Sequence, residues 1–148
     1  MPQNPRPLVR VARAADSDQV WPLARDFATS FAPRREAFEA TWRALHSAPG
    51  TLVAVAESDE VVVGYLLAHR HLTFLANGPV AWVDEVMVAE HRRRSGVGRD
   101  LMRHAEQWGR DNGAAYLALA SRRAGAFYTA LGYEESATFF KKPLTDAP

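Results

Sequence analysis

A turn rich in arginine and glycine is the stretch of this sequence that fits chemistry better than packing. HRRRSGVGRD spans residues 91–100, between an apolar, strand-like run and a segment of helical periodicity. The first turn of a helix has unpaired N–H groups and a partly positive end, and Gly96 and Gly98 let an anion approach the backbone. Arg93, Arg94 and Arg99 add positive charge. The spacing predicts a diphosphate site, and a solvated basic turn is the alternative.

The strands around this turn are predicted from alternating apolar residues. They are expected at residues 8–14, 51–57, 61–72 and 80–89, with the last three forming an antiparallel meander. The short apolar run 115–120 is typical of a buried strand beside a parallel neighbour. Because strand–helix–strand crossovers are right-handed and join parallel strands, residues 82–88 and 115–120 are expected to run parallel. Residues 134–144 are predicted to form a closing strand.

Helices are predicted at residues 16–31 and 35–45, after the glycine turn, and in a short segment that ends at Gly132. Asp16 is expected to be the N-cap of the first helix, with Gln19 as its capping-box partner. In the helix after the turn, the apolar face is expected to comprise Val97, Leu101, Ala105 and Trp108. The fold class is therefore α/β (α+β), with a mixed sheet flanked by about four helices.

Composition limits the function classes. With 148 residues, 47% of them hydrophobic, the chain fits a single domain over residues 1–148, with loose tails at 1–7 and 143–148. A net charge of +1 argues against a generally cationic, nucleic-acid-binding surface. The absence of cysteine excludes disulfides and thiolate chemistry. No apolar run matches a membrane span or a signal peptide, so a cytoplasmic protein is expected, with no membrane partner.

Two motifs resemble those of the GNAT N-acetyltransferase superfamily. VMVAEHRRRSGVGRDLM resembles its acyl-CoA-binding motif, in which Arg93, Gly96 and Gly98 meet the required pattern. AGAFYTALGYEE resembles its second signature, with Phe127-Tyr128 followed by Gly132-Tyr133. The motifs occur in order and at a fitting separation, and the strand and helix order matches over nearly the whole chain.

The resemblance implies acetyl-CoA as cosubstrate, without a metal. Backbone groups of the strand 82–88 would pair with the pantetheine arm where the two parallel strands splay apart, and N–H groups from Arg94 to Arg99 would hold the pyrophosphate. Arg94 stands where a glycine is usual, and Ser121 stands where many members have asparagine. The implied cofactor-binding residues are Val86, Met87, Val88, Arg93, Arg94, Ser95, Gly96, Val97, Gly98, Arg99, Ser121 and Tyr128.

The resemblance also implies direct transfer of an acetyl group to a primary amine. An alkyl amine with a pKa of about 10.4 is mostly protonated at neutral pH, which costs roughly 4–5 kcal/mol, so a proton acceptor is needed. Asp84 and Glu85 are candidates, directly or through water. Because neighbouring residues of a strand point to opposite faces, one of the two is expected to face the acceptor, and the pattern does not select which. Tyr128 is the candidate general acid that protonates the CoA thiolate.

The sequence also allows other interpretations. The acid pair could be solvated or salt-bridged, and Tyr128 could be core packing. The domain could be a non-catalytic acyl-CoA sensor, or an arginine patch that includes Arg92 and Arg103 could bind nucleic acid. His69 and His71 share a strand face but have no evident third metal ligand. The acceptor could be a small cationic amine, such as a polyamine or aminoglycoside, or a peptide amine, and a homodimer stays open.

Overall fold

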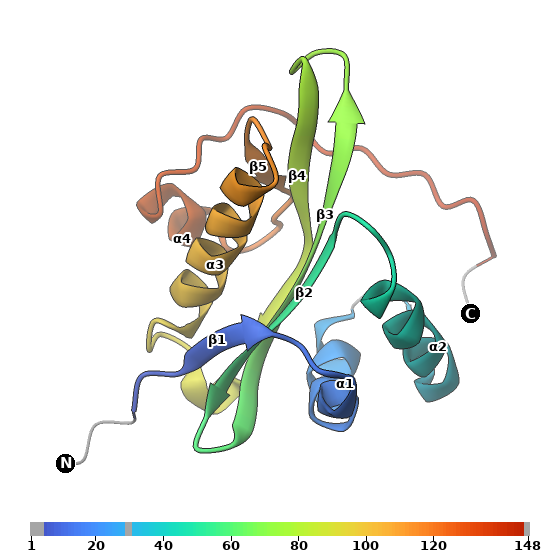
Figure 1. The fold of residues 1–148 in the computed structure, drawn as a ribbon, viewed down its shortest axis with the longest axis vertical. Helices are drawn as coiled ribbons and strands as arrows, with labels where there is room; N and C mark the ends of the chain where they lie inside the picture. The colour runs from blue at the N-terminus through green and yellow to red at the C-terminus, as the bar shows by residue number, and fades with distance from the viewer. Residues whose placement is uncertain (1–4, 29–30, 147–148) are drawn as a thin grey trace.

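The computed structural model describes residues 5–28 and 31–146 as a five-stranded sheet with helices on both sides (Figure 1). The strands are β1 Leu8–Val11, β2 Thr51–Ser58, β3 Val61–Thr73, β4 Gly78–Val88 and β5 Leu117–Leu119. The helices are α1 Ser17–Phe27, α2 Arg35–His46, α3 Val97–Asp111 and α4 Gly125–Ala130, with short 3-10 turns η1 Ala14–Asp16 and η2 Glu90–Arg92. The mixed sheet and its helices confirm the predicted fold class.

The sheet order is β1-β2-β3-β4-β5. Strands β1 to β4 pair antiparallel, and β4 pairs parallel with β5, which confirms the predicted meander and crossover. The parallel pairing covers only Ala81 to Val83 of β4, although β4 continues to Val88. Within the described residues, the second half of β4 therefore has no strand beside it on the β5 side.

The two faces of the sheet carry separate apolar clusters. On one face, α3 buries Val97, Leu101 and Ala105 completely or nearly so, which confirms its predicted apolar stripe. On the opposite face, Val20 of α1 and Trp42 of α2 pack against the sheet. Figure 1 shows α1 and α2 on one side of the sheet and α3 and α4 on the other. The sheet therefore separates the side of the glycine turn and α3 from the side of α1 and α2.

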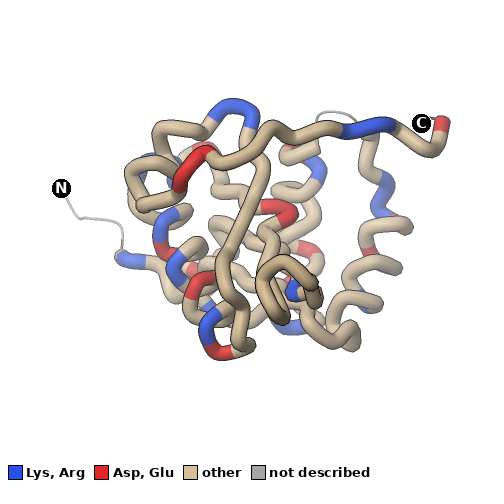
Figure 2. Tube along the Cα trace, turned by 90° about the horizontal axis from the view of Figure 1, so that it is seen from above, with Lys and Arg blue, Asp and Glu red and all other residues tan. Residues whose placement is uncertain are grey.

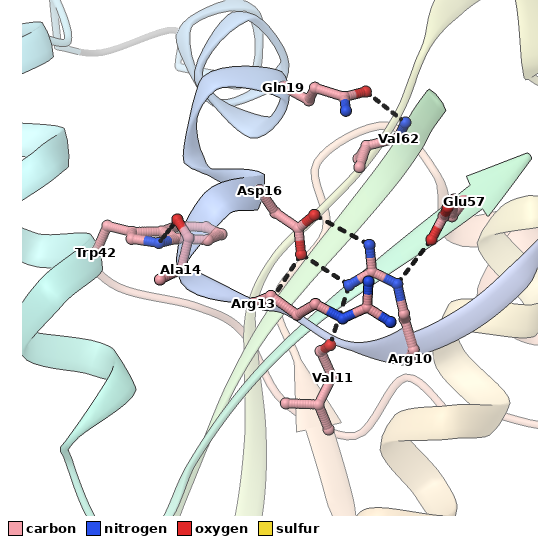
Figure 3. A network of polar contacts seen from close by, with 9 residues as sticks. All are labelled: Arg10, Val11, Arg13, Ala14, Asp16, Gln19, Trp42, Glu57 and Val62. Carbon is pink, nitrogen blue, oxygen red and sulfur yellow. Dashed lines mark hydrogen bonds and ion pairs between the residues drawn. The ribbon is translucent and has the colours of Figure 1, made fainter. Parts of the chain in front are cut away.

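A charged network fixes the start of α1 (Figure 3). The Arg10 guanidinium of β1 donates hydrogen bonds to Asp16 at 2.7 Å and to Glu57 of β2 at 2.7 Å. The Asp16 carboxylate also accepts a bond from the backbone N–H of Arg13 at 2.7 Å. The hydrogen bond from Arg10 lowers the pKa of Asp16, against a smaller opposing effect of burial. This network connects β1, η1 and β2.

The predicted capping box of the first helix is wrong. Asp16 does stand at the N-cap position of α1, as predicted, but its side chain binds Arg10 and the N–H of Arg13 rather than the N–H groups of α1. Gln19 instead accepts a hydrogen bond at 2.8 Å from the N–H of Val62 in β3 (Figure 3). Both side chains are therefore engaged by partners outside α1. Helix α1 ends at Phe27 rather than at residue 31 because Ala28 is extended, and residues 29–30 lie outside the described part.

The predicted closing strand is also wrong for the single chain. Residues 134–144 form neither a strand nor a helix, and all of them are exposed. Strand-type residues need a partner backbone, and none of the described strands pairs with this segment.

The ends of the chain were expected to be loose. Residues 1–4 and 147–148 lie outside the described part, whereas Pro7 is buried and the Pro5 carbonyl accepts a hydrogen bond from Arg92 at 3.3 Å. Within the described ranges, no helix has the length and apolar character needed to cross a bilayer.

Candidate active site

The turn between β4 and α3 has a left-handed backbone at two positions. Arg94 has a φ of 63° and Gly96, the N-cap of α3, has a φ of 90°. A left-handed φ favours glycine, which gives a physical reason for the glycine that the family usually has in place of Arg94. The hydroxyl of Ser95 donates a hydrogen bond to the Arg92 carbonyl and holds the turn. Such alternation of backbone conformation forms concave nests of N–H groups.

The N–H groups of this turn are available to a ligand. Within residues 5–28 and 31–146, no carbonyl or side chain accepts a hydrogen bond from the N–H groups of residues 94–99. The next N–H, that of Asp100, donates to the Gly96 carbonyl at 3.0 Å and begins the helical hydrogen bonding. Free donors at the N-terminus of a 15-residue helix suit a phosphate or diphosphate.

Glycine at position 98 lets α4 approach the turn. A Cβ atom there would lie 3.2 Å from Cζ of Phe127 and 3.8 Å from Cγ2 of Val88. Phe127 in turn packs edge-on against Tyr128, with ring centroids 5.0 Å apart. Tyr128 is half-buried beside the α3 cluster, and burial raises its pKa, so its hydroxyl keeps its proton at neutral pH. The predicted general acid is therefore held close to the glycine turn as a neutral phenol.

A β-bulge at Asp84 breaks the alternation expected along β4. Glu85 pairs with Leu67 and Val83 pairs with Ala68, so Asp84 is an additional residue on β4. Val83 and Val86 consequently pack in the same α3-side cluster, although they are three residues apart. The sequence analysis assumed that side chains alternate between the two faces along the whole of β4. That assumption is wrong at residue 84, where the bulge shifts the alternation by one residue.

The bulge places both carboxylates on one face. Tyr65 donates a hydrogen bond of 2.7 Å to Glu85, and Nδ1 of His69 lies 2.5 Å from the Asp84 carboxylate. Tyr65 and His69 lie four residues apart on β3, whose pairing with β2 is regular there, and therefore share one face. Tyr65 belongs to the cluster under α1 and α2. The expectation that the two carboxylates point to opposite faces of the sheet is therefore wrong, and which of them meets the acceptor stays a prediction.

Other predicted site residues have different neighbours. Arg93 Nε donates to the Val88 carbonyl at 3.2 Å, and Nη2 of Arg93 lies 3.8 Å from the Met87 sulfur, so this guanidinium lies against the end of β4. Ser121 is exposed, and its hydroxyl accepts a hydrogen bond at 3.1 Å from the N–H of Ala124 before α4.

The remaining predicted positions, in β4 and in the turn, differ in exposure. Arg94 and Arg99 are exposed beside the turn, whereas Val86 and Val97 pack in the α3-side cluster.

Two contacts of the site were not predicted from the sequence: the hydrogen bond of Tyr65 to Glu85 and the pairing of His69 with Asp84. A tyrosine in a β-rich run gives no signal beyond packing, because its partner is set by the register between β3 and β4. His69 was considered only as a metal ligand with His71, and the described residues contain no group of three potential ligands close enough to hold a metal. Arg92, one member of the arginine patch considered for nucleic acid, is 7% exposed and bonded to Pro5, so it cannot contact a polyanion.

The sequence also matches a known family. The profile of the Acetyltransferase (GNAT) family matches residues 17–133, and the chain belongs to this family. The protein is therefore an acetyltransferase with acetyl-CoA as its acyl donor, and the free N–H groups of the turn fit the diphosphate of that molecule.

Individual relatives cover nearly the whole chain. An aminoglycoside N(6′)-acetyltransferase type 1 of Stenotrophomonas maltophilia is 29% identical over 154 residues, covering 93% of this chain and 94% of that protein. Glucosamine-6-phosphate N-acetyltransferase from Arabidopsis thaliana has a TM-score of 0.84 at 15% identity, with 95% and 100% coverage. An aminoglycoside N-acetyltransferase solved in complex with CoA has a TM-score of 0.82 at 18% identity, with 98% and 99% coverage. At these identities the solved structures establish the fold.

Proposed function

We propose that this protein transfers the acetyl group of acetyl-CoA to a primary amine of a cationic small molecule, with aminoglycosides as the acceptor class. The single observation that carries the proposal is the placement of Asp84 and Glu85 on the same face of the sheet, where β4 has parted from β5. Two neighbouring carboxylates on the acceptor side attract a polycation and can take its proton.

The part of the proposed site that binds acetyl-CoA lies at the C-terminal end of β4 and in the turn that follows it. The N–H groups of residues 94–99 hold the diphosphate, and the backbone of Met87 and Val88 pairs with the pantetheine arm. In the present structure Arg93 hydrogen-bonds the Val88 carbonyl at 3.2 Å, so this side chain moves aside where pantetheine uses that carbonyl. The thioester then lies between Tyr128 and the bulge at Asp84.

The proposed reaction is a direct attack. The amine gives its proton to Asp84 or Glu85, directly or through water, and its neutral nitrogen then forms a bond to the thioester carbon. When the carbon–sulfur bond breaks, Tyr128 donates its hydroxyl proton to the departing thiolate, and the attacked nitrogen loses its remaining extra proton through water to the phenolate, which leaves a neutral amide, a free thiol and a protonated Tyr128. Burial supports this assignment because it raises the pKa of Tyr128 and keeps the phenol protonated until the sulfur develops charge.

Aminoglycosides are favoured among cationic amines by the name of a relative that aligns with 93% of this chain. That protein carries the name of an aminoglycoside N(6′)-acetyltransferase and is 29% identical to this chain over 154 residues. Helices α1 and α2, which lie over the face of the two carboxylates, are in position to contact the acceptor. Arg35 of α2 already pairs with Asp18 and Glu39, so it is not free to repel a cation there.

The test is free-thiol release from acetyl-CoA with three acceptors: an aminoglycoside with a 6′-amino group, its analogue with a 6′-hydroxyl, and spermidine. We expect turnover with the first, a mass increase of one acetyl group, and little turnover with the second. Glu85→Gln combined with Asp84→Asn should lower turnover by at least about 10²-fold, whereas Glu36→Gln, an exposed carboxylate on α2, should not change it. Equal turnover with the 6′-amino and 6′-hydroxyl compounds would show that the 6′ nitrogen is not the acceptor, and preference for spermidine would exclude the aminoglycoside class.

A further inference from the structure

Arg92, the last residue of η2, is a buried cation directly before the glycine turn. Its side chain is folded into the protein, and the residue is only 7% exposed. Among the described residues, its guanidinium donates a hydrogen bond from Nη2 to the Pro5 carbonyl at 3.3 Å, whereas the buried Nε has no acceptor. Buried polar atoms without a partner are rare in native structures, so this one calls for a physical reason.

No carboxylate compensates the charge of Arg92. None of the ion pairs within residues 5–28 and 31–146 includes this residue, and the positions outside those ranges contain no aspartate or glutamate. A buried charge without a counter-ion is unfavourable for folding, and arginine cannot avoid that cost by releasing its proton. The unliganded protein therefore contains a cation that lowers its own stability.

The backbone of Arg92 is part of the turn that the diphosphate site uses. Its N–H donates a hydrogen bond to the Ala89 carbonyl at 2.9 Å, and its carbonyl accepts the hydrogen bond from the Ser95 hydroxyl. The free N–H groups begin two residues later, at Arg94. Arg92 is thus fixed beside the proposed diphosphate site, although its buried side chain does not reach the ligand.

The hydrogen-bond partner of Arg92 places the guanidinium near the start of α3. Pro5 is followed by Arg6, whose side chain donates hydrogen bonds of 3.2 and 3.0 Å to the Asp100 carboxylate in the first turn of α3. Asp100 is the acidic side chain of that turn, and its charge is already paired with Arg6. The positive charge of Arg92 is therefore not offset by the carboxylate that stands next to the proposed site.

The rest of the chain supplies no strong positive field. Its formal net charge is +1, and Figure 2 shows Lys and Arg stretches interspersed with Asp and Glu stretches along the trace. The exposed arginines of the turn, Arg93, Arg94 and Arg99, are open to solvent, where salt screens their charges. A buried charge is screened much less, so Arg92 can act on a nearby anion without contact.

We propose that Arg92 is a buried counter-charge for the diphosphate of acetyl-CoA, and that the same charge destabilises the protein when no ligand is bound. The negative charge of the bound diphosphate offsets the guanidinium, so the ligand gains affinity and the protein gains stability together. This role rests on the placement of the diphosphate at the turn in the proposed function. It adds to the N–H donors a residue that acts on the ligand through space.

Arg92→Met tests both parts of the proposal, because methionine fills a similar space without a charge. Calorimetric titration should show CoA binding about tenfold weaker than in the wild type. Thermal unfolding without CoA should give the variant a melting temperature equal to or above that of the wild type, because the unpaired cation is gone. The Pro5 carbonyl keeps a donor in the variant, the Ser58 hydroxyl at 3.5 Å.

Salt distinguishes the buried charge from the exposed ones. The Debye length falls from about 10 Å at 0.1 M salt to about 3 Å at 1 M, so an exposed arginine loses most of its effect at high salt. The loss of CoA affinity in Arg99→Met should therefore shrink in the high-salt titration, whereas the loss in Arg92→Met should persist. A purely structural role of Arg92 would also resist salt, but it would lower the melting temperature of the unliganded variant.

Arg103→Met is the matched control. It removes the same charge from an exposed position on α3 and should change neither the CoA affinity nor the melting temperature.

Two results overturn the role of Arg92. One is a CoA affinity of Arg92→Met equal to that of the wild type, and the other is a lower melting temperature of the unliganded variant. If Arg99→Met and Gly98→Val also leave CoA affinity unchanged, the diphosphate does not lie at this turn, and its placement in the proposed function fails as well. If those two variants bind CoA more weakly and Arg92→Met does not, only the role of Arg92 fails.

Discussion

Tyr65 and Glu85 face each other across neighbouring strands, with the tyrosine hydroxyl donating a hydrogen bond of 2.7 Å to the carboxylate. Tyr65 is only 3% exposed, and burial, reinforced by the nearby carboxylate, raises its pKa far above the neutral range. It therefore remains a donor at any pH at which the protein works. The bond restricts a half-buried carboxylate to one orientation beside the proposed acceptor.

Tyr65→Phe is expected to lower kcat/KM for the amine about tenfold or more. A hydrogen bond to a charged group contributes about 1.5–3 kcal/mol, and tenfold corresponds to about 1.4 kcal/mol. Because Tyr65 acts through Glu85 and does not contact the donor, the dissociation constant for CoA should stay unchanged in calorimetric titration. Tyr116→Phe, an exposed tyrosine next to β5, is the control and should behave as wild type. A parallel loss of CoA affinity in Tyr65→Phe would instead indicate general damage to the sheet.

The two carboxylates can be separated by single substitutions. If Asp84 and Glu85 act on one bound amine, Asp84→Asn and Glu85→Gln should each reduce kcat/KM by about 10²-fold, the lower range for a general base. The double variant should lose much less than the product of the two effects, because residues that act as a unit are not additive. Strictly multiplicative losses in steady-state assays would assign the residues to independent roles.

The glycine turn and α3 were predictable because both depend on local sequence. An apolar repeat at 97, 101 and 105 produces the buried stripe of α3, and the glycines before it mark the turn. The shared face of Asp84 and Glu85 was not predictable, because the bulge at Asp84 arises from the register between β3 and β4. The capping box failed because a side chain competes with the helix: Arg10 of β1, six residues before Asp16, binds the Asp16 carboxylate.

Gly98→Val is expected to weaken CoA binding by about tenfold to a hundredfold. A Cβ atom at this position would lie 3.2 Å from Phe127, so the added side chain must displace α4 or fill the space over the free N–H groups. Gly125→Val is the matched control, since a Cβ at Gly125 meets nothing within 4 Å. Titration with CoA compares the two variants, and equal affinities would show that the turn does not need glycine at residue 98.

Tyr128→Phe is expected to lower kcat by about 10²-fold or more, within the usual contribution of a general acid. The ring packing against Phe127 and Tyr133 is retained, so folding and CoA affinity should change little. Thiol release measured against pH adds a second criterion. Because burial raises the pKa of Tyr128, any alkaline decline in the wild type that reports this group should lie above the ordinary tyrosine value and be absent from the variant. Unchanged turnover in the variant would remove Tyr128 from the proposed mechanism.

The Arg10–Asp16 pair predicts a stability difference that disappears in acid. The side chains are 14% and 9% exposed, so Asp16→Asn should lower the free energy of unfolding by about 2–4 kcal/mol at pH 7. Because the folded-state pKa of Asp16 is lowered from 3.8, mainly by the Arg10 hydrogen bond, its contribution is fully present above pH 3.8. The contribution is lost as pH falls below that value through the folded-state pKa, so wild type and variant should converge in denaturant titrations there. Asp26→Asn, with a carboxylate 61% exposed and 3.4 Å from Arg25, should have almost no effect at either pH. If the difference between wild type and Asp16→Asn stayed constant through the acid range, the ionised carboxylate would not be the source of the stability.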